Sequence, residues 1–300
     1  MASMRDIKRR KTSVESTQQI TKAMKLVSTV KLQRAKARAE QSKFYFRAVY
    51  ETVTSILAKA GAVDHPYLKA GESGKKAVIL ISSNKGLAGG YNSNVIKLIT
   101  RNEEFNKDNT TIYAIGKKGK DALMRAGYPI MKDFSEAIEE PVYKDGMIVT
   151  QDLLKAFEEG EISEIYLAYT FFKNTVGHVP TLIKLLPVDV DAVQQDIDGD
   201  GVTDEKPAPT APMNFEPADE EALNLIIPKY ISSLIYGALI SAQAAENGAR
   251  MQAMDNATNN AAEMIDHLAL LYNRARQGAA APGSACRAHS SGRGSRPGPF

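Results

Sequence analysis

The C-terminal third of the chain contains one apolar repeat that is too long to be buried inside a single small domain. Between Leu223 and Gln277, small or apolar residues recur every three or four positions for about 50 residues, as in the seam of a coiled coil. No proline interrupts the run after Pro228. A helix of this length measures roughly 75–80 Å, more than twice the width of a small domain. It therefore requires a partner helix, which the small residues in mid-seam would allow to approach closely.

The N-terminal 60 residues supply the expected partner. Residues 3–60 contain no glycine or proline and are predicted to form one long helix. Two apolar seams follow one another along this helix, out of register with each other. The first contains Ile20, Ala23, Val27 and Val30, and the second contains Phe46, Val49, Val53, Ile56 and Ala60. We expect the first seam to pair with the C-terminal helix in an antiparallel coiled coil and the second to pack on a globular body.

The charge of the chain is unevenly distributed. Residues 1–60 carry 14 Lys and Arg against 4 Asp and Glu, a net charge of +10, whereas the whole chain carries +3. Such a basic arm indicates an acidic partner, which could be nucleic acid, a membrane surface or a protein, or else a solvated helix face. A basic coiled-coil protein that binds nucleic acid is therefore the alternative function. The lysines are interleaved with an apolar seam, however, which favours helix pairing.

Three features bear on the compartment. The single cysteine, Cys286, excludes a disulfide framework and is typical of a reducing environment. No uninterrupted apolar run reaches the roughly 18 residues that a membrane span requires. The basic N-terminus lacks the apolar region of a signal peptide. We therefore expect a cytoplasmic protein with no membrane span of its own.

The middle of the chain alternates between strand-like and helix-like segments, which predicts a small α/β sheet domain. Strands are expected at 77–81, 111–115, 162–172 and 178–187, and helices at 93–105, 118–126 and 147–158. The expected division is a coiled-coil helix at 1–60, an α/β domain at 61–217 that ends in an acidic, proline-rich loop at 190–217, a second coiled-coil helix at 218–277, and an atypical disordered tail at 278–300.

A glycine-rich segment follows the first predicted strand. Gly86, Gly89 and Gly90 lie where backbone N–H groups at the start of a helix could hold a phosphate. Their spacing matches neither G-x-G-x-x-G nor a P-loop. We interpret the segment as a structural turn, and a nucleotide-dependent enzyme is the third functional class to consider.

An acidic segment in the 190–217 loop resembles part of a calcium site. Asp196, Asp198 and Asp200 match the first half of an EF-hand loop, but the twelfth position is Pro207 instead of glutamate. We interpret it as a solvated acidic loop, or at most as a weak cation site. No spacing of histidine or cysteine predicts a zinc site, and no catalytic constellation is evident.

Four segments, taken together, resemble the gamma subunit of bacterial F-type ATP synthases. They are MRDIKRR at 4–10, TQQITKAMKLV at 17–27, ISSNKGLAGGYN at 81–92 and ARMQAMDNAT at 249–258, which continues to YNRAR at 272–276. The resemblance implies an antiparallel coiled coil of the two chain ends plus a Rossmann-like α/β domain without a cofactor. It also implies a rotor shaft, without a catalytic site, that couples ion flow through a membrane c-ring to the catalytic β subunits.

The resemblance further implies partners and contact residues. The partners are the α and β subunits of an α3β3 ring, the epsilon subunit and the c-ring, at the cytoplasmic face of the bacterial membrane. Lys22, Met24 and Lys25 match the region that meets the β lever, and Arg250 and Gln277 match polar contacts to β loops. The chain departs from the family after Gln277, where an apolar helix normally enters the top bearing of the ring. We therefore expect a shortened tip.

Overall fold

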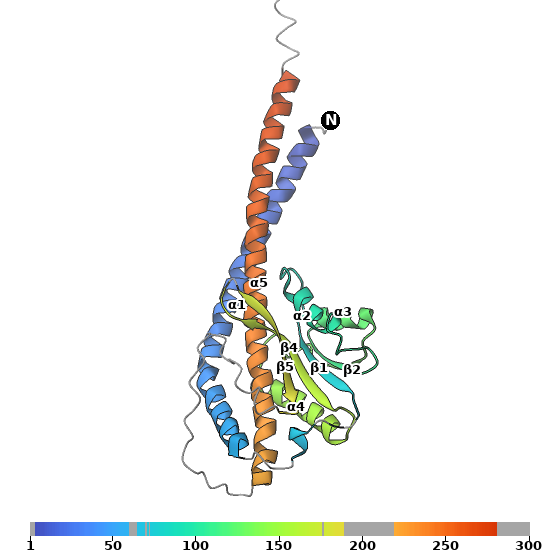
Figure 1. The fold of residues 1–300 in the computed structure, drawn as a ribbon. Helices are drawn as coiled ribbons and strands as arrows, with labels where there is room; N and C mark the ends of the chain where they lie inside the picture. Colours follow the sequence, from blue (N-terminus) through green and yellow to red (C-terminus); the bar gives the residue numbers. More distant parts are fainter. Residues whose placement is uncertain are drawn as a thin grey trace, which may run out of the picture. The chain divides into compact units, whose positions relative to one another are not determined.

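The computed structural model describes residues 4–59, 65–69, 71, 73–175, 177–188 and 219–280 (Figure 1). The elements are α1 (Met4–Lys59), the short 3-10 helix Pro66–Leu68, β1 (Lys76–Ile81), α2 (Tyr91–Thr100), β2 (Thr110–Ile115), α3 (Lys117–Ala126), β3 (Ile130–Asp133), α4 (Tyr143–Glu158), β4 (Glu164–Phe172), β5 (His178–Leu186) and α5 (Asp219–Ala280). The mixed α/β fold with two long terminal helices is the one expected. Residues 281–300 and the 190–217 loop lie outside the described residues.

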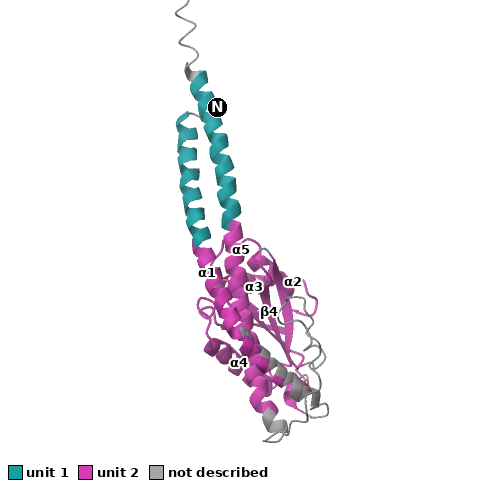
Figure 2. Cartoon of the chain, turned by 90° about the vertical axis from the view of Figure 1, so that its left-hand side faces the viewer, with its two compact units in different colours: residues 1–26, 254–300 teal, residues 27–253 magenta. Residues whose placement is uncertain are grey.

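The chain divides into two compact units (Figure 2). Unit 1 comprises Met1–Leu26 and Met254–Phe300, and unit 2 comprises Val27–Ala253. Part of α1 and much of α5 pack into the body of unit 2, so the unit boundary crosses both helices. The expected division, in which each long helix was a domain of its own, stays a prediction.

The sheet of unit 2 has the strand order β3-β2-β1-β4-β5. The first four strands are parallel, with Val78 of β1 opposite both Ile112 and Tyr166, and β5 runs antiparallel to β4. This is a Rossmann-like arrangement, and the chain reverses its direction across the sheet between β1 and β4. In open α/β sheets, ligands bind at such a switch point, beyond the carboxyl ends of the strands.

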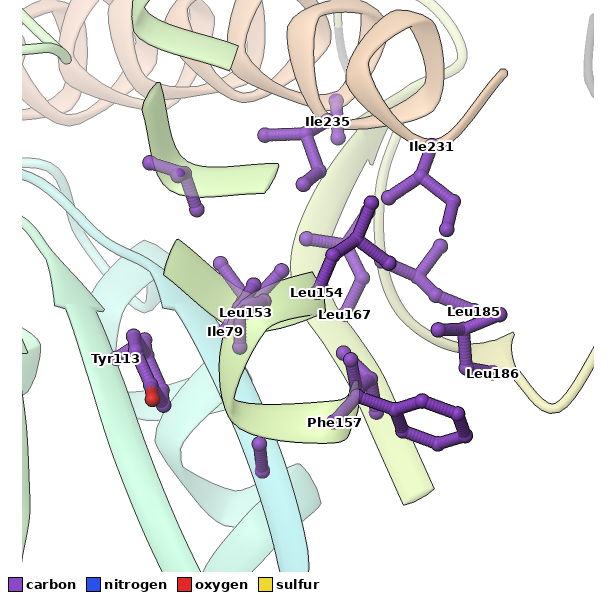
Figure 3. Close-up of a cluster of buried hydrophobic side chains, with 14 of the residues drawn as sticks. Ile79, Tyr113, Leu153, Leu154, Phe157, Leu167, Leu185, Leu186, Ile231 and Ile235 are labelled. Carbon is purple, nitrogen blue, oxygen red and sulfur yellow. The ribbon is translucent and has the colours of Figure 1, made fainter. Parts of the chain in front are cut away.

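Each face of the sheet is covered by two helices. On one face, α4 and α5 cover a core that includes Ile79, Leu153, Leu167 and Ile235 (Figure 3). On the other face, α2 and α3 bury a second cluster with Leu80 at its centre, which is fully buried. Burying an aliphatic side chain of this size contributes about 1.5–3 kcal/mol, so both layers stabilise the sheet.

One helix among the described residues is long and apolar enough, by length and composition, to cross a bilayer. It is the Leu223–Gly278 part of α5, whose most apolar window has a mean hydropathy of 1.5. In that window 56% of the residues are buried within the protein. Ile227, Ile231 and Ile235 lie in the core of unit 2, so the packing of that unit accounts for these apolar residues.

The predicted first seam of α1 was wrong. Ile20, Val27 and Val30 are 58%, 57% and 48% exposed, so they do not face α5. Among the described side chains of α1, the buried positions fall at intervals of fourteen, seven, four and three residues, which is compatible with a heptad repeat whose position 14 is half-buried. They are Ile7, Thr21, Ser28, Leu32 and Ala35. The prediction selected one apolar stripe, whereas the buried side of α1 combines the apolar Ile7 and Leu32 with hydroxyl groups and a small side chain.

The predicted second seam is supported where its side chains are described. The Phe46 ring makes an edge contact with Tyr236 of α5 at a centroid distance of 5.9 Å, and Val49 packs against the core of unit 2. The side chains of Val53 and Ile56 lie outside the described part of the chain.

Two helix boundaries and one strand differ from the expectation. Helix α2 ends at Thr100, and Phe105 reaches the core from the following loop. Helix α4 begins at Tyr143, because the Asp145 carboxylate accepts the Val142 N–H at 3.0 Å and caps the first turn. Strand β3 was not predicted, since it is a four-residue edge strand without a buried face.

Candidate functional site

The glycine turn between β1 and α2 is held by its own polar side chains. The Ser83 hydroxyl donates to Lys85 O at 2.6 Å, and the Asn92 side chain accepts the Ser83 N–H at 3.0 Å. Leu87 and Gly89 adopt positive φ values of 62° and 55°. For a leucine this conformation is strained, and the fixed turn around it is what sustains it.

Helix α5 fills the crevice where a Rossmann-like fold would bind a nucleotide. The Tyr91 hydroxyl, at the start of α2, donates to Ala242 O of α5 at 3.2 Å. At the end of β4, the Phe172 N–H donates to the Ser241 hydroxyl at 2.9 Å. These contacts lie at the carboxyl ends of β1 and β4, which is the switch point of the sheet. They favour the interpretation of Gly86, Gly89 and Gly90 as a structural turn rather than a phosphate site.

Arg250 joins the glycine turn to α5. Its guanidinium pairs with Glu246 at 2.7 Å, one helical turn away, and donates to Lys85 O and Gly86 O at 3.3 Å. The two charged side chains are only 12% and 13% exposed. Two of the segments that carry the family resemblance, 81–92 and 249–258, therefore contact each other through Arg250. We call this set of contacts, with Glu246, the Arg250 clamp.

Burial dominates the electrostatics of this clamp. Desolvation raises the pKa of the Glu246 carboxyl, and Arg250 and Lys31 only partly oppose that rise. A buried carboxylate of this kind needs its cation, because an unpaired charge in such a position is costly. Glu246 was not singled out from the sequence. The available signal was its spacing of four residues from Arg250 on the same helix face.

The other sequence-predicted contact residues all lie in unit 1. Lys22 is exposed and Met24 is half-buried on α1, and Gln277 is exposed on α5. Lys25 forms an ion pair with Asp255 of α5 at 2.6 Å. The 22 residues between Asp255 and Gln277 correspond to roughly 33 Å of helix, so these residues make two separate surfaces, not one site.

Among the described residues, few features indicate a metal-binding or small-molecule site. No three His, Cys, Asp or Glu side chains gather there in a way that could hold a metal ion. Asp196, Asp198 and Asp200 lie outside the described residues, so the weak cation site stays a prediction. A shallow depression between Thr100 and Asn109 lies near the start of β2, away from the switch point.

Comparisons with known proteins agree with this architecture. A family model described as ATP synthase matches residues 3–280. The ATP synthase gamma chain of Lachnoclostridium phytofermentans is 62% identical over 277 residues, which cover 92% of this chain and 94% of the relative. The chain belongs to the ATP synthase gamma-chain family. The gamma chain of Alkaliphilus metalliredigens is a further relative at 41% identity, covering 91% of this chain and 92% of its own length.

Solved structures support the fold of this gamma chain. A chain of the Euglena gracilis mitochondrial ATP synthase, solved with its OSCP, F1 and c-ring parts, superposes with a TM-score of 0.64. The match covers 99% of this chain and 98% of the other at 16% identity, a level at which the comparison concerns the fold alone. None of these comparisons supports the nucleic-acid-binding alternative.

Proposed function

We propose that this gamma chain is the central rotor shaft of a bacterial F-type ATP synthase. It couples transmembrane ion flow through a c-ring to the conformational cycling of catalytic β subunits, and it has no catalytic site or cofactor of its own. Its partners are an α3β3 ring, an epsilon subunit and the c-ring, at the cytoplasmic face of the membrane. The observation that carries the proposal is unit 1, in which the two ends of the chain form a two-helix coil.

The outer surface of unit 1 supports this function. Ile20 and Leu26 of α1 are 58% and 67% exposed, and Met264 and Leu270 of α5 are 55% and 70% exposed. Large apolar side chains in such numbers on one slender coil indicate a surface that another protein covers. A ring that encloses the coil on all sides covers apolar residues wherever they point, whereas a partner on one side would leave some of them in water.

Within this function, the contact residues divide between two levels of the coil. Lys22 and Met24 contact the β lever at the level where Lys25 pairs with Asp255, and Gln277 contacts β loops nearer the end of α5. Arg250 acts on the ring through the glycine turn that it clamps. The excess of basic residues on α1 complements an acidic lever, and long-range attraction of this kind is weakened by salt.

Reconstitution tests the proposal. The full chain is co-expressed with the other subunits of its own complex, including the c-ring and the rest of the membrane sector. The complex is purified, assayed for ATP hydrolysis, and reconstituted into sealed vesicles to measure ATP-driven ion pumping. We expect a stable assembly, in which Lys22→Glu lowers pumping several-fold. The matched control is Lys97→Glu, an exposed lysine of α2 in unit 2. A chain that fails to co-purify would sink the rotor proposal, and unchanged pumping by Lys22→Glu would remove Lys22 from the contact surface.

A further inference from the structure

The seam between α1 and α5 in unit 1 contains two consecutive polar pairs. The Thr21 and Thr258 hydroxyl oxygens lie 2.7 Å apart, and each residue is only 7% exposed. One turn further along α1, Lys25 Nζ lies 2.6 Å from Asp255 Oδ1, with side chains 39% and 44% exposed. A coiled-coil seam normally carries apolar contacts at these positions. The polar pairs therefore call for an explanation other than hydrophobic stabilisation.

Polar pairs depend on axial register far more strongly than their apolar neighbours do. Met254 and Ala261, which are 5% and 6% exposed in the same seam, are a flexible side chain and a small one, and both can pack at more than one offset. Sliding α1 by one turn, about 5.4 Å, would break the Thr21–Thr258 hydrogen bond and leave each hydroxyl only the bond to its own helix, to Gln18 O at 3.0 Å and to Met254 O at 2.7 Å. It would also move Lys25 away from Asp255. Of these two offsets, only the native one makes both interhelical polar contacts.

Unit 1 also lacks a short connection that would set this offset. Its two helical segments, 4–26 and 254–280, are joined only through unit 2. A helical hairpin with a tight turn has its register fixed by the turn, whereas here side-chain contacts between α1 and α5 fix it, including the Leu32, Ala35 and Ala244 cluster within unit 2.

We propose that the Thr21–Thr258 and Lys25–Asp255 pairs are the register lock of unit 1, and that Lys25 is a positioning residue that acts through Asp255. Polar groups at seam positions are the best-attested means of specifying register, and they do so at some cost in stability. The lock holds the contact surface around Met24 at one axial position relative to α5. It concerns the chain itself and holds whether or not the rotor function is correct.

Disulfide formation between the helices of the full chain tests the lock. The two pairs have residue numbers that sum to 279 and 280, so Val14 of α1 should face Ile265 of α5 in the native register. In a Cys286→Ser background, Val14→Cys with Ile265→Cys reports the native offset. Val14→Cys with Ala269→Cys reports an offset of one turn. We expect rapid oxidation of the first pair and little of the second.

Reversing the charge of Lys25, and exchanging the charges of Lys25 and Asp255, distinguish an effect on the register of the two helices from an effect on the local stability of unit 1. Lys25→Asp places like charges together, and we expect about fivefold slower formation of the native disulfide, with a gain in the offset one. Lys25→Asp combined with Asp255→Lys should restore the native pattern. Lys22→Asp, on the exposed side of α1, is the matched control and should change neither rate. The proposal would be overturned if Lys25→Asp left the rate of native disulfide formation unchanged. It would also be overturned if the charge exchange did not restore a reduced rate.

An apolar variant covers the case in which charge reversal simply unfolds unit 1. Thr21→Val with Thr258→Val should leave α1 as protected from hydrogen exchange as in the wild type, yet raise the offset disulfide relative to the native one. If the native disulfide alone still formed, the threonines would have no part in the register. All these measurements use the isolated chain, so their failure would be distinct from a failure of the chain to assemble with α and β subunits.

Discussion

Replacing Arg250 by methionine should destabilise unit 2 by an amount that depends on pH. Methionine keeps an unbranched apolar stem but removes the cation that pairs with Glu246 at 2.7 Å. Breaking a buried ion pair by removing one partner costs about 3–5 kcal/mol. The hydrogen bonds to Lys85 O and Gly86 O are long, at 3.3 Å, and add little. We therefore expect a loss of about 3 kcal/mol at pH 8.

The pH dependence follows from the Glu246 carboxyl. Burial raises its pKa above the unfolded value of 4.5. The folded state thus binds the Glu246 proton more tightly than the unfolded state does. The contribution of this carboxyl to stability is fully present below pH 4.5 and is lost as pH rises through the folded pKa. Arg250 lowers the pKa of the Glu246 carboxyl, so its removal raises that pKa further. The pH range over which stability is lost then extends to higher pH. Arg250→Met should therefore cost less at pH 5 than at pH 8.

Urea unfolding followed by circular dichroism at both pH values measures this effect, and hydrogen exchange at Lys85–Gly90 reports the turn itself. The matched control is Arg250→Met with Glu246→Met, which removes both charges and should recover most of the loss. The reasoning is refuted if Arg250→Met costs less than about 1 kcal/mol at pH 8, or if the loss is greater at pH 5.

Three further expectations concern the same unit. A Cβ on Gly116 would lie 2.0 Å from Ser82 O, and the residue has a φ of 108°. Gly116→Ala should therefore lower the free energy of unfolding by more than about 3 kcal/mol. A melting temperature within a few degrees of wild type would contradict this. Burial lowers the pKa of His178 below 6.5, so the contribution of this side chain to stability is present above pH 6.5 and lost as pH falls through the folded pKa. His178→Phe should therefore reduce the pH dependence of the unfolding free energy across that range. Tyr91→Phe removes the hydrogen bond to Ala242 O and should cost about 1 kcal/mol in urea unfolding, with an unchanged midpoint counting against a role for that bond.

The long helices could be predicted from the sequence because their signal is local. Residues 4–59 hold no glycine or proline, and the run after Pro228 repeats with a helical period over many turns. The direction in which α1 faces could not be predicted in the same way. Thr21 and Ser28 are buried, whereas the more apolar Ile20 and Val27 are exposed, so hydrophobicity alone does not identify the face that packs within the chain.

The clamp at Arg250 shows a second limit of sequence reasoning. Its hydrogen bonds to Lys85 and Gly86 join positions about 165 residues apart in the chain. Nothing within either segment indicates the other, and the resemblance to gamma subunits suggested an outward contact for Arg250. The α/β domain itself could be predicted from the apolar runs, whereas the edge strand Ile130–Asp133 could not, because only its first residue is even half-buried.

Unit 1 places polar residues in its seam beside the apolar Met254 and Ala261, and large apolar residues on its surface. The buried seam carries Thr21 and Thr258, which specify geometry but contribute little net free energy because they exchange bonds with water for bonds with each other. The outer surface carries Ile20 and Leu270, which stabilise nothing within the chain while they remain exposed. Exposed apolar area lowers the free energy only when another surface covers it. On the rotor proposal, an enclosing partner would add hydrophobic stabilisation to the coil, while the polar pairs of the seam would specify its register.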